Sequence, residues 1–485
     1  MALVLSAVMP AGARSLKRGV GENSFALGCQ LKALEEGVSW YYSWGNTPKN
    51  GYKNQVIDFT GYEFVPMCWN ARYDADKIRE YCRAHPATKY LLGFNEPNFV
   101  KQSNMTPAQA ADDWRAVKAL ADELGLKLVA PALNYSPDAP YQNPVKWMDE
   151  FVAIVGLDAF DYTAIHNYGG LGVMVDLATR FHERYGKEVW VTEFCYWPNE
   201  GDPNSGVSQD TQISSMMETV EWLETTPWIH RYAWFKAIGQ YDGAGNQTGP
   251  RYGLLERQPN GETEVSTLSQ QGWVYVYMSD FDKNRYNAVG TPLAASEYIC
   301  RAKGLLGKGN NPACPRPIEF VTFNAGAYAD YQFDVDAAGD YTLEITVSGQ
   351  GEPMRFDPEI GIVAVDSEGN ESKVLAAPRK LTLSGSDDIY TTESFAIALE
   401  AGKQTIRVKD FETRPSGMHF STLLLKKGAG IEEIAGDATG CLTLYDVAGR
   451  CVASAQSLSE IAGSLPAGLY VVRYPDNSTK KIIIQ

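Results

Sequence analysis

The stretch Tyr90-Leu91-Leu92-Gly93-Phe94-Asn95-Glu96-Pro97-Asn98 decides the fold of this chain. An apolar run typical of a buried strand leads directly into Asn-Glu-Pro, where proline has no N–H to continue the hydrogen-bonded ladder. A second run, Glu188-Val189-Trp190-Val191-Thr192-Glu193-Phe194, has the same character and also ends at a glutamate. Both runs predict strands of a parallel sheet, with Glu96 and Glu193 at the strand ends that carry reactive groups in such sheets.

Short apolar runs of this kind alternate with helical patterns from Lys17 to about Tyr286. Strands buried on both faces have such continuous apolar runs, and their alternation with helices predicts a (β/α)8 TIM barrel. The alternative is an open doubly wound sheet, which is less favoured because no glycine-rich phosphate loop follows the first strand. The expected strands are Arg18–Gly21, Val38–Trp44, Glu63–Trp69, Tyr90–Asn95, Lys127–Leu133, Tyr162–His166, Glu188–Phe194 and His230–Lys236.

Two of the intervening helices have clear start signals. Thr106-Pro107-Ala108-Gln109 is a capping box with proline at the first helical position, and Gly125 is placed to end that helix. Ser208 is placed to cap a second helix.

After about residue 286 the pattern changes to alternating strands with glycine turns, which predicts a β-sandwich. A small acidic linker follows, and the last residues form short strands again. We therefore expect a signal-peptide remnant at 1–16, a catalytic barrel at 17–287, a sandwich at 288–427 and a small β domain at 428–485.

Composition excludes several classes of function. The net charge of −16 and the pI near 4.9 disfavour nucleic acid as a partner. The five histidines form no metal-binding motif, so we expect no metal and no cofactor. No later stretch is long and apolar enough to span a membrane. We expect a monomer with a neutral substrate.

The first residues indicate export. An apolar run, Ala2–Met9, precedes the small residues Ala11-Gly12-Ala13, which is the pattern at the end of a secretory signal. We expect a secreted or cell-surface protein, with the periplasm as the alternative.

The two strand-end glutamates suggest their own chemistry. Barrel glycosidases use one carboxyl as a proton donor and a second, ionised one as a nucleophile. Like charges at close range push the two pKa values apart, which supplies this division of labour.

Five motifs in order resemble glycoside hydrolase family 128. They are Ser39-Trp40-Tyr41-Tyr42-Ser43-Trp44, Val65-Pro66-Met67-Cys68-Trp69, Gly93-Phe94-Asn95-Glu96-Pro97-Asn98, His166-Asn167-Tyr168 and Trp190-Val191-Thr192-Glu193-Phe194. The resemblance implies a retaining endo-β-1,3-glucanase acting on β-glucans such as laminarin, with Glu96 as the acid/base and Glu193 as the nucleophile.

Four polar residues are further site candidates. Asn95 is expected to bind the sugar 2-hydroxyl, and His166 and Tyr168 to shape the site of the cleaved sugar. Tyr168 also has the option of positioning Glu193, and His166 the option of a buried structural role. Asn134, at the end of the fifth strand, is a polar candidate.

Three tryptophans are expected to stack on glucose rings, because Trp44, Trp69 and Trp234 end strands two, three and eight. A packing role inside the barrel is the alternative for each of them.

The C-terminal half carries two weaker resemblances. Ala294-Ala295-Ser296-Glu297-Tyr298, Gly326-Ala327-Tyr328-Ala329-Asp330-Tyr331 and Ala338-Gly339-Asp340-Tyr341-Thr342-Leu343 resemble a family 6 carbohydrate-binding module. Leu444–Arg450, Leu465–Tyr470 and Lys480-Lys481 resemble the C-terminal sorting domain of type IX secretion substrates. We expect Pro292–Gln485 to be dispensable for hydrolysis of soluble oligosaccharides.

Two other functions remain open from the sequence. One is a two-glutamate barrel hydrolase acting on β-1,4-mannan or xylan. The other is a catalytically weak glycan-binding surface protein, which the presence of both glutamates disfavours.

Overall fold

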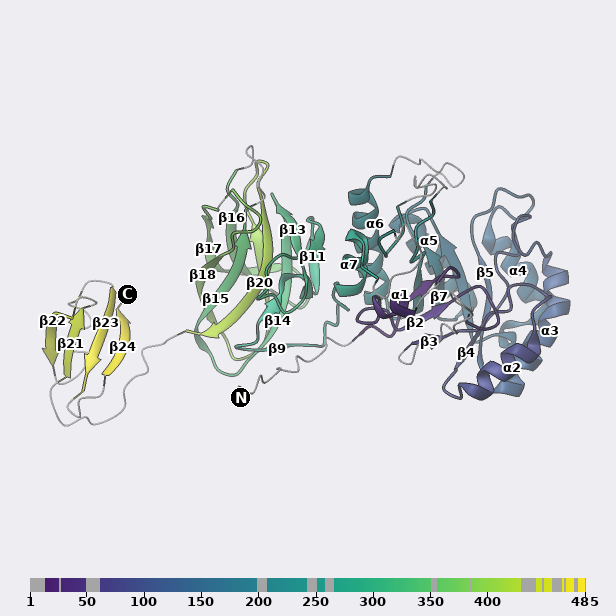
Figure 1. Cartoon of the computed structure of the whole chain (residues 1–485), viewed down its shortest axis with the longest axis horizontal. Coiled ribbons are helices and arrows are strands. Elements are labelled where there is room, and N and C mark those ends of the chain that lie inside the picture. Colours follow the sequence, from purple (N-terminus) through teal and green to yellow (C-terminus); the bar gives the residue numbers. More distant parts are fainter. Residues whose placement is uncertain are drawn as a thin grey trace.

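The N-terminal half is a barrel of parallel strands. Figure 1 shows the computed structural model, with helices α2–α5 around the strands. The strand order is β3-β2-β1-β8-β7-β6-β5-β4, and every neighbouring pair is parallel. The strands are β1 Arg18–Gly21, β2 Trp40–Tyr42, β3 Glu63–Phe64, β4 Tyr90–Leu92, β5 Lys127–Leu133, β6 Tyr162–Asn167, β7 Val189–Phe194 and β8 Ile229–Phe235. This confirms the predicted (β/α)8 fold.

The two edges of this sheet meet just beyond β3. Met67 and Leu92 form an isolated parallel bridge. The Cys68 N–H donates to the Leu92 carbonyl at 2.9 Å, and the Leu92 N–H donates to the Pro66 carbonyl at 2.9 Å. Regular strand pairing in β3 thus ends at Phe64, earlier than the expected end at Trp69. The residues that follow β3 still form hydrogen bonds with β4.

The helices begin where the sequence signals place them. The Thr106 side chain accepts from the Gln109 N–H with Pro107 in the first turn, and Gly125 ends the helix at a φ of 67°. Ser208 likewise caps its helix by accepting from the Thr211 N–H. The helices are α1 Gly28–Lys32, α2 Ala75–Ala84, α3 Pro107–Leu124, α4 Pro144–Val155, α5 Leu171–Tyr185, α6 Gln209–Thr225 and α7 Gln270–Tyr277, with 3-10 turns at Leu157–Ala159 and Ala295–Glu297.

The C-terminal half is all β. One sheet has the order β12-β13-β20-β15-β18 with β10 on β20, and the other β11-β14-β19-β16-β17 with β9 on β14. Buried side chains from both sheets form the core. The strands are β9 Asn287–Ala288, β10 Leu293–Ala294, β11 Cys300–Ala302, β12 Leu306–Lys308, β13 Ile318–Asn324, β14 Tyr328–Val335, β15 Gly339–Ser348, β16 Glu359–Val365, β17 Glu371–Lys380, β18 Thr391–Leu399, β19 Gly402–Asp410 and β20 Gly417–Lys427.

A four-stranded sheet with its own small core ends the chain, in the order β22-β21-β23-β24. Its strands are β21 Leu442–Asp446, β22 Cys451–Ala455, β23 Gly468–Arg473 and β24 Thr479–Ile484. The additional β structure predicted after the barrel is thus confirmed, while the domain boundaries stay predictions.

The barrel and the sandwich contact each other directly. Helix α7 packs against β12 and β13, and the Lys308 ammonium lies 5.2 Å from the centre of the Trp273 ring (Figure 1). Glu221 on α6 accepts hydrogen bonds from the Tyr298 hydroxyl at 2.7 Å and from Arg301 Nε at 2.5 Å. Tyr298 is fully buried in this contact, whereas the Glu221 side chain is partly exposed.

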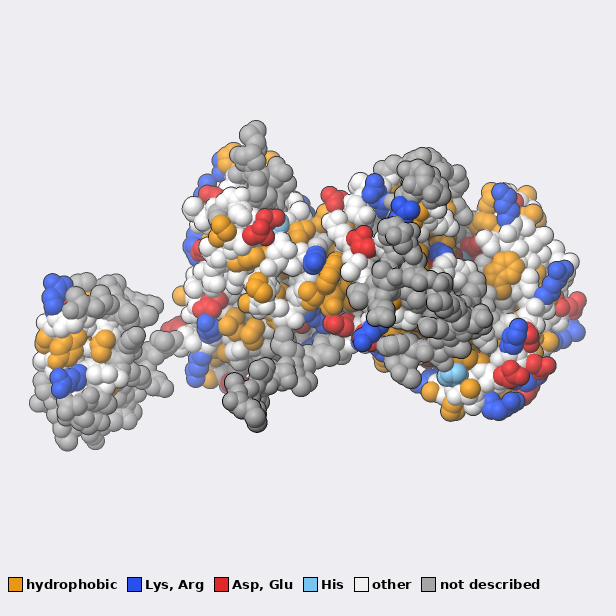
Figure 2. Space-filling view, viewed as in Figure 1, with side chains coloured by type: hydrophobic (Ala, Val, Ile, Leu, Met, Phe, Trp, Pro, Cys, Tyr) orange, Lys and Arg blue, Asp and Glu red, His pale blue; other side chains and the backbone are white. Residues whose placement is uncertain are grey.

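The structure describes residues 14–25, 28–48, 62–198, 207–241, 251–257, 266–349, 356–383, 385–428, 442–446, 449–455, 465, 468–474 and 479–484. Residues 1–13 of the expected signal segment and part of the sorting motifs lie outside these ranges. No helix within them is long and apolar enough to cross a membrane. In the view of Figure 2, basic and acidic side chains are interspersed over the described surface.

Candidate active site

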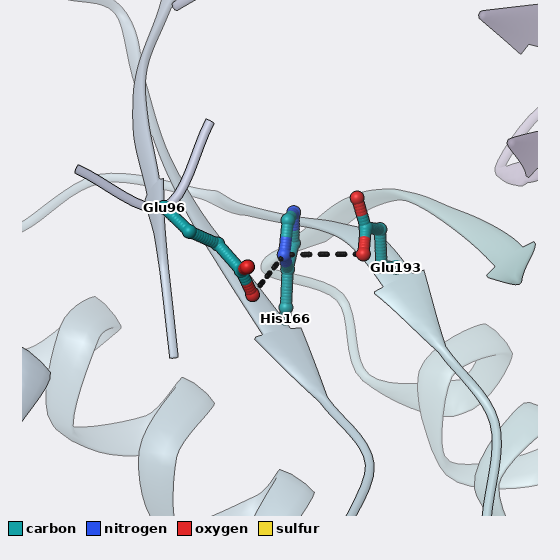
Figure 3. A group of neighbouring side chains, drawn as sticks. All are labelled: Glu96, His166 and Glu193. Atoms are coloured by element: carbon teal, nitrogen blue, oxygen red, sulfur yellow. Dashed lines mark hydrogen bonds and ion pairs between the residues drawn. The ribbon is translucent and has the colours of Figure 1, made fainter. Parts of the chain in front are cut away.

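Glu96 and Glu193 meet inside the barrel mouth. Glu193 lies on β7, and Glu96 lies four residues beyond the end of β4. Each residue is only 5% exposed. One oxygen of each carboxylate and one ring nitrogen of His166 all lie within 4.8 Å of one another (Figure 3). The structure therefore brings together the two glutamates that the sequence places 97 residues apart.

An unusual backbone conformation holds Glu96 in place. Its φ is 42°, in the left-handed region that residues with a side chain rarely adopt. The Glu96 N–H donates to the Ala132 carbonyl on β5 at 2.9 Å, and the Glu96 carbonyl accepts from the Phe99 N–H at 3.0 Å. Trp44, just past β2, is also left-handed with a φ of 54°. Such strain is typical of functional positions and is sustained by the surrounding structure.

Three side-chain N–H or O–H groups surround the Glu193 carboxylate. Trp44 Nε1 donates to Oε1 at 2.6 Å, and the Tyr42 hydroxyl shares its one proton between the Thr192 carbonyl at 2.9 Å and the same Glu193 oxygen at 3.3 Å. The Tyr168 hydroxyl donates to Oε2. Burial and the Glu193 charge raise the pKa of both tyrosines well above its usual value, so both remain donors.

The pKa of Glu193 reflects opposing influences. Burial raises it above its usual value, and the negative charge of Glu96 raises it further. His166 and the donors Tyr168 and Trp44 lower it by stabilising the ionised form. The donors thus keep a buried carboxyl available as an anion.

His166 contacts the carboxyls rather than an open surface. Its Nδ1 atom lies 2.8 Å from Glu96 Oε1 and 3.4 Å from Glu193 Oε2. The side chain is fully buried, so it has no surface on which a sugar can rest. This burial fits the structural role that was the alternative for His166, while the expectation that His166 shapes the site of the cleaved sugar stays a prediction. The Tyr168 hydroxyl donates to Glu193, which fits the predicted option that Tyr168 positions Glu193.

A metal would need lone pairs on these same three groups. The Glu193 oxygens already accept from Trp44, Tyr42 and Tyr168, and the His166–Glu96 distance is that of a hydrogen bond. We therefore interpret the group of Glu96, His166 and Glu193 as a hydrogen-bonded cluster.

The two candidate asparagines are both buried. Asn95 is 3% exposed, its Nδ2 donates to Gln102 Oε1 at 3.4 Å, and its buried Oδ1 has no hydrogen-bond partner among the described residues. Asn134 Oδ1 accepts from the Tyr135 N–H at 2.8 Å. Asn95 thus retains a free acceptor, whereas the Asn134 oxygen is already bonded locally.

The tryptophans differ in their surroundings. Trp44 and Trp69 are partly exposed and pack on the cluster of side chains inside the barrel. Trp234 is fully buried, its indole N–H donates to the Tyr252 carbonyl at 2.7 Å, and its ring packs against Phe194 and Tyr275. The expectation that Trp234 stacks on sugar is therefore wrong, because its side chain lies between the strands and the outer helices.

Phe235 takes the inward position that was expected of Trp234. Its ring lies 5.7 Å from that of Trp44 and 5.5 Å from that of Tyr168. Alternate residues of a strand face opposite sides, and Ala233 on β8 packs inside the barrel. The period of two places Phe235 on the same face as Ala233, but the sequence alone does not indicate which face lies inside the barrel. Tyr42 was missed because its role depends on a contact across the barrel.

Comparisons with known proteins assign the N-terminal half to a family. The family described as "Glycosyl hydrolase catalytic core" matches residues 19–275. No curated protein matches the chain. Among solved structures, the chain is 35% identical to a family 128 subgroup II endo-β-1,3-glucanase from Pseudomonas viridiflava, over 54% of this chain and 98% of the other, with a TM-score of 0.46.

Two further solved structures are similar over an equal share of the chain. A subgroup II endo-β-1,3-glucanase from Sorangium cellulosum is 28% identical over 54% of this chain and 98% of the other, with a TM-score of 0.44. A subgroup I endo-β-1,3-glucanase from Amycolatopsis mediterranei, in complex with laminaritriose, is 26% identical over 54% of this chain and 98% of the other, with a TM-score of 0.40.

Proposed function

Because the chain belongs to the glycosyl hydrolase catalytic core family, we propose that it is a retaining endo-β-1,3-glucanase. The observation that carries the proposal is the spacing of its two buried carboxyls, which have one oxygen each within 4.8 Å of the other. Retaining glycosidases hold their carboxyls about 5 Å apart, whereas inverting enzymes leave roughly 6.5–9.5 Å for a water molecule.

Glu193 is the proposed nucleophile, because Trp44, Tyr42 and Tyr168 direct donors at its ionised form. Its carboxylate attacks C1 of the sugar while the bond from C1 to the glycosidic oxygen breaks. Glu96 gives its proton to that oxygen. In the second step Glu96 takes a proton from water, and the resulting hydroxide attacks C1 and releases Glu193.

The substrate class rests on the five motifs that resemble family 128. Two features of the site support a sugar ligand. The unpaired Asn95 Oδ1 suits a sugar 2-hydroxyl, a contact that strengthens as the oxocarbenium-like state develops. The partly exposed ring of Trp69 suits the apolar face of a glucose unit.

The proposal also covers location and the C-terminal parts. We propose that the protein is exported, because polymeric substrate is encountered outside the cytoplasm. We also propose that the sandwich binds glycan. The last sheet would then serve as a sorting domain.

Digestion of a panel of polysaccharides tests the proposal. The purified protein is incubated with laminarin, curdlan, β-1,4-mannan and xylan, and the products are separated by anion-exchange chromatography. Early release of mixed laminari-oligosaccharides with initial β configuration, measured by proton NMR, is the expected result. The matched control is Glu193→Gln. Cleavage of mannan or xylan without cleavage of laminarin would overturn the substrate, and an initial α product would overturn retention.

A further inference from the structure

The imidazole of His166 lies between the two catalytic carboxyls (Figure 3). His166 on β6 pairs in register with Glu193 on β7, which fixes its position relative to the nucleophile. Its Nδ1 atom is closer to Glu96 Oε1, at 2.8 Å, than to Glu193 Oε2, at 3.4 Å. Both the histidine and Glu96 are buried, so neither readily exchanges this contact for one with bulk water.

The reaction restricts where the protons in this contact can be. Glu96 must carry a proton to act as an acid, and when that proton is on Oε1 the facing Nδ1 must be bare, because two donors cannot face each other across 2.8 Å. A single proton between Nδ1 and Oε1 is enough to serve both atoms. Either Nδ1–H donates to a Glu96 carboxylate, or a Glu96 hydroxyl donates to a bare Nδ1. With a proton on Nε2 in both forms, these arrangements have the same total charge.

We propose that His166 stores the catalytic proton on Nδ1 in the free enzyme and passes it to Glu96 Oε1 when the glycosidic oxygen binds. This inference rests on the proposed function. The N–H bond of the imidazolium breaks, an O–H bond forms on Glu96, and the proton then moves to the leaving oxygen. The proton that Glu96 takes from water in the second step returns to Nδ1, so the cycle balances. His166 is thus a positioning residue that acts through Glu96.

The neighbouring groups favour such a store. Glu193 on β7 and Glu96 beyond β4 place negative charges beside the ring, which stabilise an imidazolium. Tyr42 on β2 and Tyr168 beyond β6 remain neutral donors to Glu193. The ammonium of Lys236 lies 6.0 Å from the centre of the Trp44 ring and pairs with Glu22.

The first test compares pH profiles of kcat/KM for His166→Asn and the parent enzyme. The variant should lose roughly tenfold or more on laminari-oligosaccharides, because the acid step then lacks its proton store. It should lose much less on an aryl β-laminaribioside with a good leaving group. The acid limb should move to higher pH, because His166 lowers the pKa of Glu193 in the parent enzyme. His230→Asn is the matched control, since His230 bonds to Glu188 and Tyr90 away from the carboxyl pair, and its profile should not move.

The second test needs no substrate and no variant of His166. In the 15N-histidine-labelled parent protein, the Nδ1 resonance should change when Glu96 is replaced by glutamine, because glutamine cannot share the proton. An Nδ1 that stays protonated and unchanged in Glu96→Gln would overturn the inference, as would equal losses on both substrates with an unmoved acid limb. If the Nδ1 resonance changes in Glu96→Gln but the parent protein does not cleave laminarin, only the proposed function would be overturned.

Discussion

The indole N–H of Trp44 donates a 2.6 Å hydrogen bond to Oε1 of Glu193. The donor comes from the end of β2 and the acceptor from β7, so the contact joins two strands that are not neighbours in the sheet. A tryptophan expected to stack on sugar therefore also orients the proposed nucleophile. Its ring remains partly exposed.

Trp44→Phe should retain an aromatic ring and lose this donor. Hydrogen bonds to charged groups are worth about 1.5–3 kcal/mol, so kcat/KM should fall roughly tenfold to hundredfold. The acid limb of the pH profile should move to higher pH, because the Trp44 N–H lowers the pKa of Glu193. Tyr42→Phe is the matched comparison and should have a smaller effect, since its contact is longer at 3.3 Å. Equal effects of the two changes would show that the indole bond has no special role.

Glu96→Ala and Glu193→Ala should fail in different steps. Without Glu193 no glycosyl-enzyme ester forms, and laminarin hydrolysis should fall about 10⁴-fold or more. Without Glu96, an activated aryl glycoside should still undergo the first step, and added azide should give a β-azide. Azide should give an α-azide with Glu193→Ala. Gas chromatography or NMR of the azides checks the assignment, and the opposite pairing of products would exchange the two roles.

Trp234→Ala and Trp69→Ala should separate packing from binding. Trp234 is fully buried, and removing such a side chain costs about 3–5 kcal/mol of unfolding free energy. Trp69→Ala should instead raise KM severalfold, since aromatic stacking contributes about 1 kcal/mol. Urea denaturation and laminarin kinetics on both variants decide between these roles. A Trp234→Ala protein of parental stability with a raised KM would contradict the observed packing.

Glu193→Gln should stabilise the folded protein at neutral and higher pH. Burial raises the folded-state pKa of Glu193 above its usual value, so the native state retains a proton at a pH at which the unfolded chain has released it. The penalty for ionising this group develops as pH rises above about 4.5 and is absent below that value. The Tm difference between variant and parent should therefore be positive at pH 8 and close to zero at pH 4. A constant difference across this range would contradict the pKa assignment.

Arg301→Ala should weaken the contact between barrel and sandwich. It leaves Glu221 without its ion-pair partner, and burial already raises the pKa of this carboxyl. Breaking a fully buried pair costs about 3–5 kcal/mol, and we expect about 2 kcal/mol here because the Glu221 side chain is 24% exposed. Arg79→Ala, which breaks exposed pairs with Asp76 and Glu123, should cost much less than Arg301→Ala. Chemical denaturation measures both, and equal values would show that the interface pair is not buried in solution.

The same interface qualifies the expectation that Pro292–Gln485 is dispensable. A barrel ending near Asn287 would expose α7 and leave Glu221 without Tyr298 and Arg301. The truncated protein should turn over short oligosaccharides while folded, but with a lower Tm than the full chain. An unchanged Tm would contradict the packing described for α7.

The sequence predicted the barrel and its two glutamates because each signal was local. An apolar run that ends in a carboxyl marks a strand end, and the Thr106 box and Gly125 mark both ends of a helix. No local pattern revealed the contact of His166 with both carboxyls, since that contact depends on how β6 pairs with β7.

The sequence also did not show which side of β8 the Trp234 side chain occupies. Strands buried on both faces lack the alternation of polar and apolar residues that distinguishes the inside of a barrel from the outside. The docking of the sandwich joins Glu221 to a residue 80 positions later, which no local pattern reveals.

The left-handed backbone at Trp44 and Glu96 has a consequence for how the sequence can vary. Glycine and asparagine adopt that conformation at lower cost than tryptophan or glutamate, so either replacement would relieve strain. A library ranked only by resistance to heat would therefore enrich smaller residues at positions 44 and 96, and those clones would be inactive. Ranking the same library by turnover would restore the original residues. Positions at which the two rankings disagree would outline the catalytic centre without any knowledge of its substrate.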